Sequence, residues 1–443
     1  MDQTKTRKRY LLNVGSTNAL PVLSLLATLV TTPILLRSLG KSDFGIWVLL
    51  QSFLYWLELA KFGFNTTLVR DLAAIRGFPE KRGQVQTMVS STFWSSAAVS
   101  VLLFVLSFAF VPLFKILFQI APEKTASTIG AFYLVFFVFV FNYLRASLDS
   151  LFYAFDRYYL RNLIGGANTL LSAVLIVAVF LSRKGTVLDL AGIVLFLAVL
   201  QFIATLLLAR RRWGFVPSPR GFDMDIVKKM FRPSLGYFAI SLSALAIFRS
   251  DNLVIAAFLP MEVLAVYAIA YNLTDYAMRF IWNFSELLSP TFSSCYYNNE
   301  MARLRSMFGR TVLLTIALAA LAALALFFFG PWFLKIWVGG DNVVPKPILN
   351  VFILTLFSYC ITHACGVFIN SIGKHEPVVW ASGIEAVLNV TLSLIWVRAH
   401  GAIGVALGTL IAHLLTTGWF VPYWSWKQAR HCLHKPRGAV PEK

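Results

Sequence analysis

Ten charged residues interrupt the long apolar stretches of this sequence, and they are the side chains best suited to binding or proton chemistry. They are Glu58, Lys61, Arg145, Asp149, Arg249, Asp251, Asp275, Arg279, Glu286 and Glu385. If these stretches cross a bilayer, a charge near its centre costs about 2.5–3.5 kcal/mol on insertion scales. Charges kept at such a cost indicate a polar pathway or a binding site.

Three of the cations suit an anionic ligand. Lys61 and Arg279 fall at nearly equivalent positions of an internal repeat, which is described below. Arg249 lies two residues before Asp251, so the two side chains leave a helix on different sides and cannot pair with each other. Ammonium and guanidinium groups bind phosphate oxygens strongly. We therefore predict that Lys61, Arg249 and Arg279 hold a phosphate or diphosphate.

The acids permit two interpretations. Glu58, Asp251, Asp275 and Glu286 either carry a coupling proton or cation, or only balance charge. Glu58 precedes Lys61, and Asp275 precedes Arg279, at spacings that favour ion pairs on one helix. For Arg145 and Asp149, four residues apart, structural pairing is the favoured interpretation.

Aromatic and amide side chains accompany these charges. Such residues suit sugar rings, although ordinary helix packing explains them equally well. The predicted glycan contacts are Tyr55, Trp56, Tyr271, Asn272, Tyr276 and Asn283. Neither a paired C-x-x-C nor an H-E-x-x-H motif occurs, so we expect no metal and no cofactor.

The composition indicates whether these residues lie in a water-soluble protein or in a membrane protein. Of 443 residues, 13% are charged and 58% are hydrophobic, whereas a soluble domain usually carries about a quarter charged residues. Six segments of 21 residues or more hold no charge: 10–36, 83–114, 162–182, 311–334, 347–373 and 401–426. A helix of about 20 apolar residues spans a bilayer core. We predict an all-α, polytopic membrane protein.

The apolar stretches predict about twelve membrane-spanning helices. They cover residues 12–37, 43–69, 88–114, 127–150, 160–182, 188–209, 232–259, 263–294, 309–337, 346–372, 377–398 and 401–426. With both termini in the cytoplasm, cytoplasmic segments hold 26 Lys and Arg residues and the opposite segments hold nine. This bias follows the positive-inside rule. The net charge of +19 is therefore mainly a sign of orientation, and no nucleic-acid partner is expected.

The two halves of the chain resemble each other. FVPLF at 110–114 matches FGPWF at 329–333, and residues 39–47 align without gaps onto 259–267. Each copy has an even number of spans, so the copies share one orientation, as in parallel repeats. We predict six-helix lobes at 1–209 and 232–426. A basic cytoplasmic linker at 210–231 joins them, and a basic cytoplasmic tail follows at 427–443.

Short motifs in a fixed order resemble those of a known family. LGKSDFGIW at 39–47 is similar to the turn between the first two spans of bacterial polysaccharide flippases. FG at 62–63 with RDLA at 70–73 is similar to the end of their second span, and DNLVI at 251–255 to the start of their second half. Over nearly its whole length the chain resembles the Wzx-type O-antigen and exopolysaccharide flippases of the multidrug/oligosaccharidyl-lipid/polysaccharide (MOP) exporter superfamily.

The resemblance implies a MATE-like fold and transport without covalent chemistry. The implied substrate is a polyprenyl-diphosphate-linked oligosaccharide, moved by alternating access across the bacterial inner membrane for O-antigen, exopolysaccharide or capsule synthesis. The expected partners are this substrate, membrane lipids and other polysaccharide assembly proteins. Lys61 is a departure, because the family often has an acid two residues before the glycine at Gly63. A cation there favours an anionic ligand.

Three alternatives stay open. A cation-coupled multidrug exporter of the same superfamily would use the embedded acids, which outnumber the embedded bases. A membrane glycosyltransferase or polymerase would need a larger extracytoplasmic loop than this sequence offers. A lipid II flippase of the superfamily is expected to have more spans than the twelve predicted here.

Overall fold

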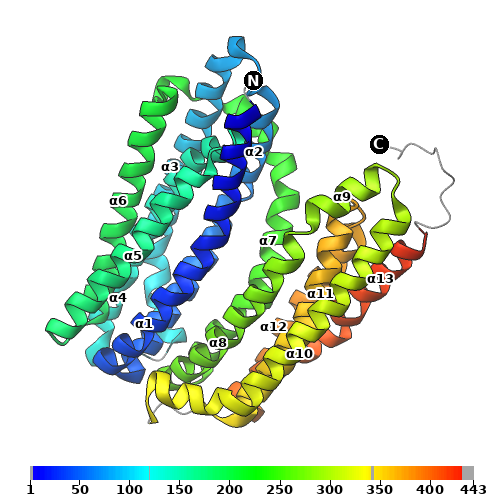
Figure 1. The fold of residues 1–443 in the computed structure, drawn as a ribbon. Coiled ribbons are helices and arrows are strands. Elements are labelled where there is room, and N and C mark those ends of the chain that lie inside the picture. Colours follow the sequence, from blue (N-terminus) through cyan, green and yellow to red (C-terminus); the bar gives the residue numbers. More distant parts are fainter. Residues whose placement is uncertain (1–2, 119, 341–343, 432–443) are drawn as a thin grey trace. The chain divides into compact units, whose positions relative to one another are not determined.

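The structure, a computed structural model, describes residues 3–118, 120–340 and 344–431, and Figure 1 shows its fold. Within these ranges the regular elements are all helices, which confirms the all-α prediction. The chain divides into two compact units, Met1–Leu242 and Ser243–Lys443. Of the predicted tail at 427–443, residues 432–443 lie outside the described part.

The first unit is built from α1 to α6 and the first part of α7. The bounds are α1 Gln3–Leu57, α2 Phe64–Ile75, α3 Arg82–Leu117, α4 Pro122–Ala154, α5 Tyr158–Ser182, α6 Val187–Trp213 and α7 Met224–Phe258. Three short 3-10 turns join them: η1 Glu58–Lys61, η2 Pro79–Lys81 and η3 Pro219–Gly221. The predicted linker at 210–231 thus contains the end of α6, η3 and the start of α7.

The second unit contains the rest of α7 and six further helices. These are α8 Met261–Glu286, α9 Ser289–Tyr297, α10 Met301–Val338, α11 Lys346–Ser371, α12 Glu376–Leu415 and α13 Thr417–His431. The boundary between the units falls inside α7, between Leu242 and Ser243. The predicted lobe boundary at residue 232 stays a prediction.

Nine helical stretches in the described residues are long and apolar enough to cross a membrane. Two of them contain a glycine with a non-helical backbone, Gly40 in α1 (φ 78°, ψ 170°) and Gly401 in α12 (φ 61°, ψ −145°). These glycines lie where the sequence predicts turns between consecutive spans. If the two sides of each glycine are counted separately and the more polar α8 is added, the number agrees with the twelve predicted spans.

Two predicted spans, 43–69 and 263–294, are not continuous helices. In the first, η1 and the left-handed residues Phe62 and Gly63 separate α1 from α2. A Cβ at Gly63 would lie 2.7 Å from the carbonyl oxygen of Ser234 in α7, so this close approach requires glycine. In the second, α8 ends at Glu286 and α9 begins at Ser289. Pro290 in the first turn of α9 favours a new helix start.

One helix is central in each unit. In the first, α4 packs against α1, α2, α3, α5 and α6; in the second, α11 packs against α8, α9, α10, α12 and α13. The apolar windows of α4 and α11 are 44% and 56% buried, against at most 33% for the other seven stretches. They are the fourth and tenth predicted spans, which the repeat makes equivalent. Their common role agrees with the predicted duplication.

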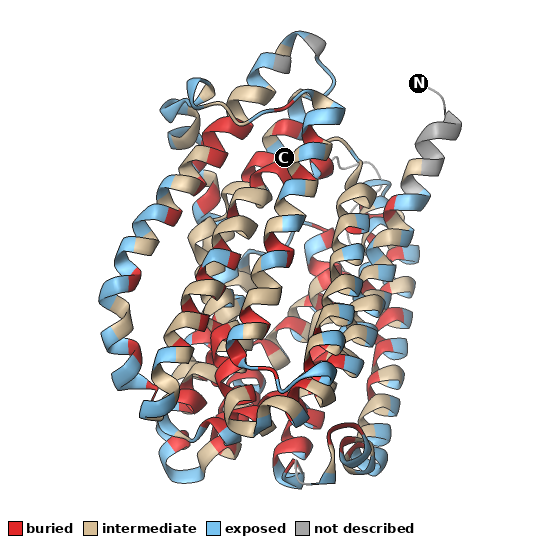
Figure 2. Ribbon diagram, turned by 90° about the vertical axis from the view of Figure 1, so that its left-hand side faces the viewer, coloured by how far each residue is buried: buried red, intermediate tan, exposed pale blue. Residues whose placement is uncertain are grey.

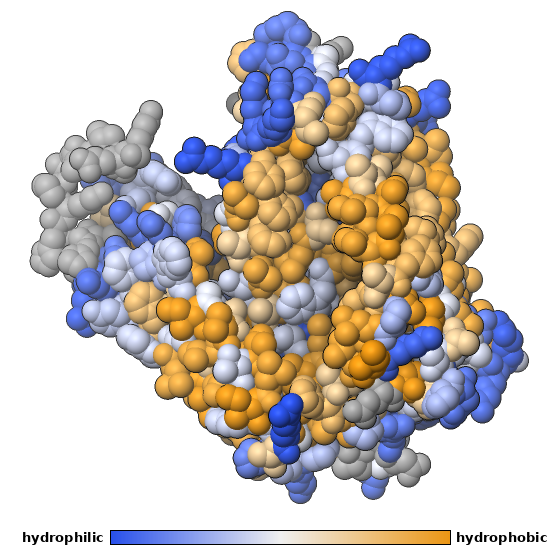
Figure 3. All heavy atoms as spheres, turned by 180° about the vertical axis from the view of Figure 1, so that it is seen from behind, coloured by the Kyte–Doolittle hydropathy of each residue, from blue (hydrophilic) through white to orange (hydrophobic). Residues whose placement is uncertain are grey.

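The other helices expose large apolar side chains. On α10, Leu313, Leu321 and Phe328 are each about two-thirds exposed, and exposed residues continue along many of the helices in Figure 2. Apolar side chains cover much of the face in Figure 3, and hydrophilic ones gather toward its two ends. Soluble proteins rarely expose apolar surface on this scale. The protein is a multi-pass membrane protein.

Candidate functional site

A small pocket in the second unit brings several predicted residues together, and we call it the acid pocket. It is lined by residues of α7, α8, α11 and α12, among them Asp251, Tyr271, Asp275, Tyr359 and Thr409. The space inside is about 30 Å³, and one water needs about 10–15 Å³ measured in this way. The acid pocket therefore suits a water, a proton or a small cation, and it is too small for a diphosphate.

Asp251 of α7 is the most constrained acid in this pocket. Its side chain is buried, and its Oδ2 accepts hydrogen bonds from the hydroxyls of Tyr267 (2.6 Å) and Thr409 (2.8 Å). Its Oδ1 has no hydrogen-bond partner among the described residues. A buried carboxylate oxygen without a donor is costly. Binding of a proton or a cation at Oδ1 removes that cost.

Asp275 of α8 is the second acid of the pocket. Its Oδ2 accepts a hydrogen bond of 2.8 Å from Nε of Arg279, one turn later on the same helix. In the described part of the chain, Oδ1 of Asp275 and the hydroxyl of Tyr271 have no hydrogen-bond partner. The acid pocket thus holds three polar atoms with unused capacity. The ion pair that the spacing favours is present, and Arg279 keeps a half-exposed side chain.

Arg249 is held next to this pocket by an aromatic ring. The guanidinium carbon lies 5.6 Å from the ring centroid of Tyr271, within the range of a cation–π contact. Tyr271 itself lines the pocket with the two acids. Five predicted residues therefore gather in the second unit: Arg249, Asp251, Tyr271, Asp275 and Arg279.

Lys61 and Glu58 are placed differently. Both belong to η1 in the first unit, where they form an ion pair. Lys61 directly precedes the break at Phe62, whereas Arg279 lies seven residues before the end of α8 at Glu286. The two cations therefore do not hold the same place relative to the breaks in their spans. The grouping of Lys61 with Arg249 and Arg279 stays a prediction.

The remaining predicted residues lie outside the lining of the acid pocket. Glu286 ends α8, and its Oε1 lies 3.4 Å from Nε2 of His363. Tyr55 is exposed, whereas Trp56, Asn272, Tyr276 and Asn283 are partly buried. Of the six predicted glycan contacts, Tyr271 alone lines this pocket. Arg145 pairs with Asp149 at 3.0 Å, as favoured from their spacing.

A second polar cluster adjoins the acid pocket, and sequence reasoning missed it. Tyr359 lines the pocket and donates a hydrogen bond of 2.6 Å to Oε1 of Glu385. Nδ1 of His413 lies 3.2 Å from the same oxygen, and Thr417 donates to the other carboxylate oxygen. All four side chains are buried. In the sequence Glu385 stands out only as an embedded charge, and His413 has no evident role.

The signal that reveals this cluster is a spacing of four residues on both sides of Gly401. Glu385, Asn389 and Ser393 precede the glycine at that spacing, and Val405, Thr409 and His413 follow it at the same spacing. Each residue of the first set contacts one of the second. Nδ2 of Asn389 donates to Thr409 at 3.2 Å, and the hydroxyl of Ser393 donates to the Val405 carbonyl at 3.5 Å.

Two glycines allow these two parts of α12 to approach. A Cβ at Gly404 would lie 2.4 Å from the carbonyl oxygen of Trp396, and one at Gly408 would lie 3.0 Å from the amide nitrogen of Ser393. Small residues four apart permit such close packing of membrane helices. The G-x-x-x-G motif at 404–408 is therefore a packing element.

Comparison with known families agrees with this architecture. Residues 11–295 match the family model described as polysaccharide biosynthesis protein. The chain belongs to this family. Residues 238–395 also match the model described as MatE, while no curated protein matches the chain. The predicted superfamily is confirmed.

Solved structures show the same fold as this member of the polysaccharide biosynthesis family. An inward-facing multidrug resistance MATE family transporter of the MOP superfamily is 15% identical to this chain, with a TM-score of 0.76. The match covers 95% of this chain and 100% of that transporter. The lipid II flippase MurJ in its inward closed conformation is 17% identical, with a TM-score of 0.72. The match covers 94% of this chain and 87% of MurJ. A MOP superfamily transporter from Pyrococcus furiosus is 13% identical, with a TM-score of 0.63. The match covers 97% of this chain and 96% of that transporter. The chain thus has the fold of MOP superfamily transporters.

Proposed function

We propose that the protein is a flippase that moves a polyprenyl-diphosphate-linked oligosaccharide across the bacterial inner membrane, for cell-surface polysaccharide synthesis. The observation that carries this proposal is the polysaccharide biosynthesis family match over residues 11–295. The fold shared with a lipid II flippase adds support. Both termini lie in the cytoplasm in this proposal, because Lys and Arg concentrate on that side of the predicted spans.

The physical problem of such a substrate is its polar head. A glycan and a diphosphate cannot cross hydrocarbon unaided, whereas the polyprenyl chain can stay in the lipid. Two lobes that alternate in access, at 1–209 and 232–426, would shield the head while the tail leaves sideways. Membrane lipids and other polysaccharide assembly proteins are the proposed partners.

The diphosphate is assigned to cations beside the acid pocket. Arg249 and Arg279 carry planar donor groups that match phosphate oxygens in pairs, and the half-exposed Arg279 is accessible. In the proposal Lys61 supplies a third cation from the first unit. Tyr271, stacked under Arg249, and the other predicted aromatic and amide residues contact the sugars.

The acid pocket supplies the coupling site in this proposal. Its volume of about 30 Å³ and the unpartnered oxygens of Asp251 and Asp275 suit a proton or a monovalent cation. Moving one charge across the membrane yields about 2.3 kcal/mol per 100 mV. Glu58 balances the charge of Lys61 instead, and Glu286 lies beside His363, outside the pocket.

A second candidate function is cation-coupled export of multidrug-type substrates. The fold shared with a multidrug resistance transporter at a TM-score of 0.76 and the acids of the pocket favour it. Such an exporter would bind a cationic, apolar molecule near these acids. Arg249 and Arg279 would then hinder substrate binding rather than assist it.

Paired substitutions separate the two functions. A strain that depends on this protein for surface polysaccharide receives the Arg249→Ala, Arg279→Ala double variant. Our proposal expects loss of surface polysaccharide at a normal protein level, while the control Arg303→Ala, an exposed arginine paired with Glu300, has no effect. Normal polysaccharide together with increased drug resistance in the double variant would support the exporter instead.

A further inference from the structure

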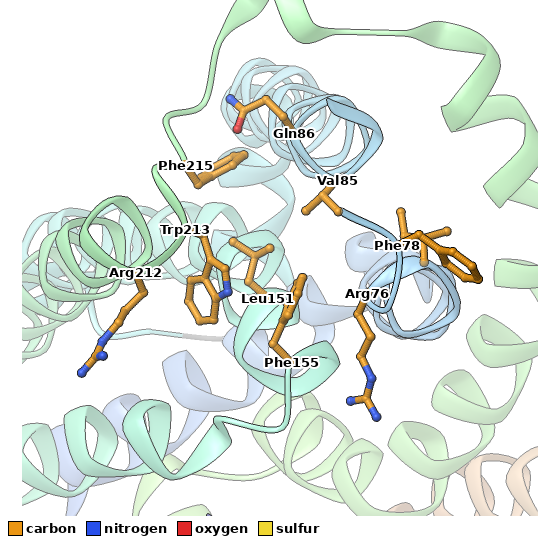
Figure 4. A pocket seen from close by; sticks show the side chains of 10 residues that line it. Arg76, Phe78, Val85, Gln86, Leu151, Phe155, Arg212, Trp213 and Phe215 are labelled. Atoms are coloured by element: carbon orange, nitrogen blue, oxygen red, sulfur yellow. The ribbon is translucent and has the colours of Figure 1, made fainter. Parts of the chain in front are cut away.

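A larger pocket lies in the first unit, apart from every residue assigned above, and we call it the arginine pocket. Its volume is about 500 Å³, within the range of small-molecule sites. Arg76 and Arg212 contribute the charges, and Phe78, Phe155, Trp213 and Phe215 contribute aromatic surface. Figure 4 shows these side chains around the ends of α2, α4 and α6 and the start of α3. It is thus a concave site that combines cations with aromatic faces.

The walls of the arginine pocket are firmly built. Gly214 ends α6 in a left-handed conformation (φ 67°), and the chain then returns across α3. Gln86 of α3 donates a hydrogen bond of 2.6 Å to the carbonyl of Val216, and Ser91 accepts one of 2.9 Å from the amide of Asp223. Phe215 is almost fully buried in the core of this unit. The shape therefore belongs to the fold and not to a loose loop.

The charge of the pocket is incompletely neutralised. Nη1 of Arg76 donates to the Ala154 carbonyl at 2.8 Å and pairs with Asp156. Asp156 thus neutralises Arg76, whereas no ion pair of Arg212 with an acid occurs among the described residues; both arginines are exposed. The C-terminal dipole of α6 stabilises Arg212 in part.

The pKa of a neighbouring arginine, Arg157, reflects the same excess of positive charge. Arg157 lies between α4 and α5, outside the spans. The pKa of Arg157 is below its usual value because the group is partly buried and because the positive charges of Arg9 and Arg212 are close. The positive charges of Arg9 and Arg212 thus act on Arg157 at this end of the unit. An anion bound there would relieve that repulsion.

The position of the pocket indicates which kind of molecule would present an anion to it. The pocket lies where α2, α4 and α6 end and α3 begins, on the side that the charge bias predicts to be cytoplasmic, so we expect it near the lipid headgroups. Phe78 is half exposed, so aromatic surface is available next to the charges. Basic pockets between membrane helices on that side suit phosphate headgroups.

We propose that the arginine pocket binds the phosphate group of a membrane lipid, attracted by the positive charges of Arg76 and Arg212 on its two sides, with Phe155 and Trp213 against the adjoining part of the lipid. The lipid is either an anionic glycerophospholipid or a polyprenyl phosphate, since both carry the same group. This binding needs no transport, so it holds or fails separately from the proposed function.

Native mass spectrometry of the full chain, purified in detergent, tests this proposal. Phosphatidylglycerol, a polyprenyl phosphate and inorganic phosphate are added in separate titrations. The Arg76→Gln, Arg212→Gln variant should bind lipid about tenfold more weakly, equivalent to about 1.4 kcal/mol. The matched control Lys228→Gln, Lys229→Gln removes two charges from the same unit outside the pocket and should bind as the native chain does.

The three ligands distinguish the source of the phosphate. Selective loss of phosphatidylglycerol binding identifies a bulk phospholipid, and selective loss of polyprenyl phosphate binding identifies the carrier lipid. Arg212→Gln alone should also weaken binding, and it leaves the contacts of Arg76 intact if the double variant does not fold. Lipid binding equal to that of the native chain in both double variants, or binding of inorganic phosphate alone, overturns the proposal.

Discussion

The carboxylate of Asp251 accepts a 2.8 Å hydrogen bond from the hydroxyl of Thr409, although 158 residues separate the two along the chain. Thr409 also accepts a hydrogen bond from Asn389 at 3.2 Å. These contacts tie α7 to both parts of α12. A change of protonation or cation occupancy at Asp251 would therefore act directly on the packing of α12.

Replacing Asp251 tests the acid pocket as a coupling site. Asp251→Asn keeps the size of the side chain but cannot exchange a proton or bind a cation as a carboxylate does. We expect substrate translocation in proteoliposomes to fall at least about tenfold, which corresponds to about 1.4 kcal/mol of activation free energy. Asp225→Asn, an exposed acid on the same helix, is the control. Unchanged translocation by Asp251→Asn would remove the pocket from the mechanism.

Thr409→Val tests the link between Asp251 and α12. The substitution keeps the shape but removes the donor, so a buried carboxylate loses one of its two hydrogen bonds. We expect the free energy of unfolding in detergent to drop by about 1–3 kcal/mol. Thr391→Val is the comparison, because Thr391 is exposed and donates only within its own helix. Equal stability of the two variants would mean that the contact contributes little.

A double-mutant cycle measures the pairing of Glu385 with His413. The single variants Glu385→Gln and His413→Phe and the double variant are compared by thermal unfolding. Since the two groups lie 3.2 Å apart and are buried, we expect a coupling free energy of about 0.5–3 kcal/mol. Strictly additive losses would show that Tyr359 and Thr417 satisfy Glu385 without the histidine.

Gly63 and Gly214 form a matched pair for backbone strain. Both have positive φ, 74° and 67°, so alanine at either position costs about 1 kcal/mol or more. A Cβ at Gly63 would also lie 2.7 Å from atoms of Ser234 and Tyr237, whereas one at Gly214 meets nothing within 4 Å. Thermal unfolding should show a larger loss for Gly63→Ala. The reverse order would contradict the close approach of α7 at this point.

Single cysteines test the predicted orientation. In a Cys432→Ser background the remaining cysteines, Cys295, Cys360 and Cys365, are buried. In intact inner-membrane vesicles with the cytoplasmic face inside, an impermeant maleimide should label Lys115→Cys and spare Lys374→Cys until detergent is added. Labelling of Lys374→Cys alone would show that the protein has the opposite orientation in the membrane.

Much of the fold follows from the sequence, because apolar length and Lys and Arg distribution are properties of one helix at a time. The turns at Gly40 and Gly401 fall between predicted spans for that reason. The breaks at Phe62 and Leu287 were missed. Apolar character continues through both, and the break at Gly63 depends on contact with α7, which the local sequence does not reveal.

The candidate site was predictable only in part. Embedded charge alone points to Asp251 and Asp275, since the cost of a charge in lipid is independent of its neighbours. The unpartnered oxygens, the small volume of the acid pocket and the role of Tyr359 depend on which helices meet. The arginine pocket escaped prediction for a related reason. Its arginines lie among many basic residues of the predicted cytoplasmic side, where only the aromatic walls distinguish them.

The matched polar residues on the two sides of Gly401 also bear on how the chain enters the membrane. Either half of α12 alone would expose Glu385 and Asn389, or Thr409 and His413, to hydrocarbon. Together they bury these groups against each other. We therefore expect the two halves to leave the translocation machinery as one helical hairpin, already packed together before it enters the lipid. The small residues Gly404 and Gly408 permit this close packing during biogenesis.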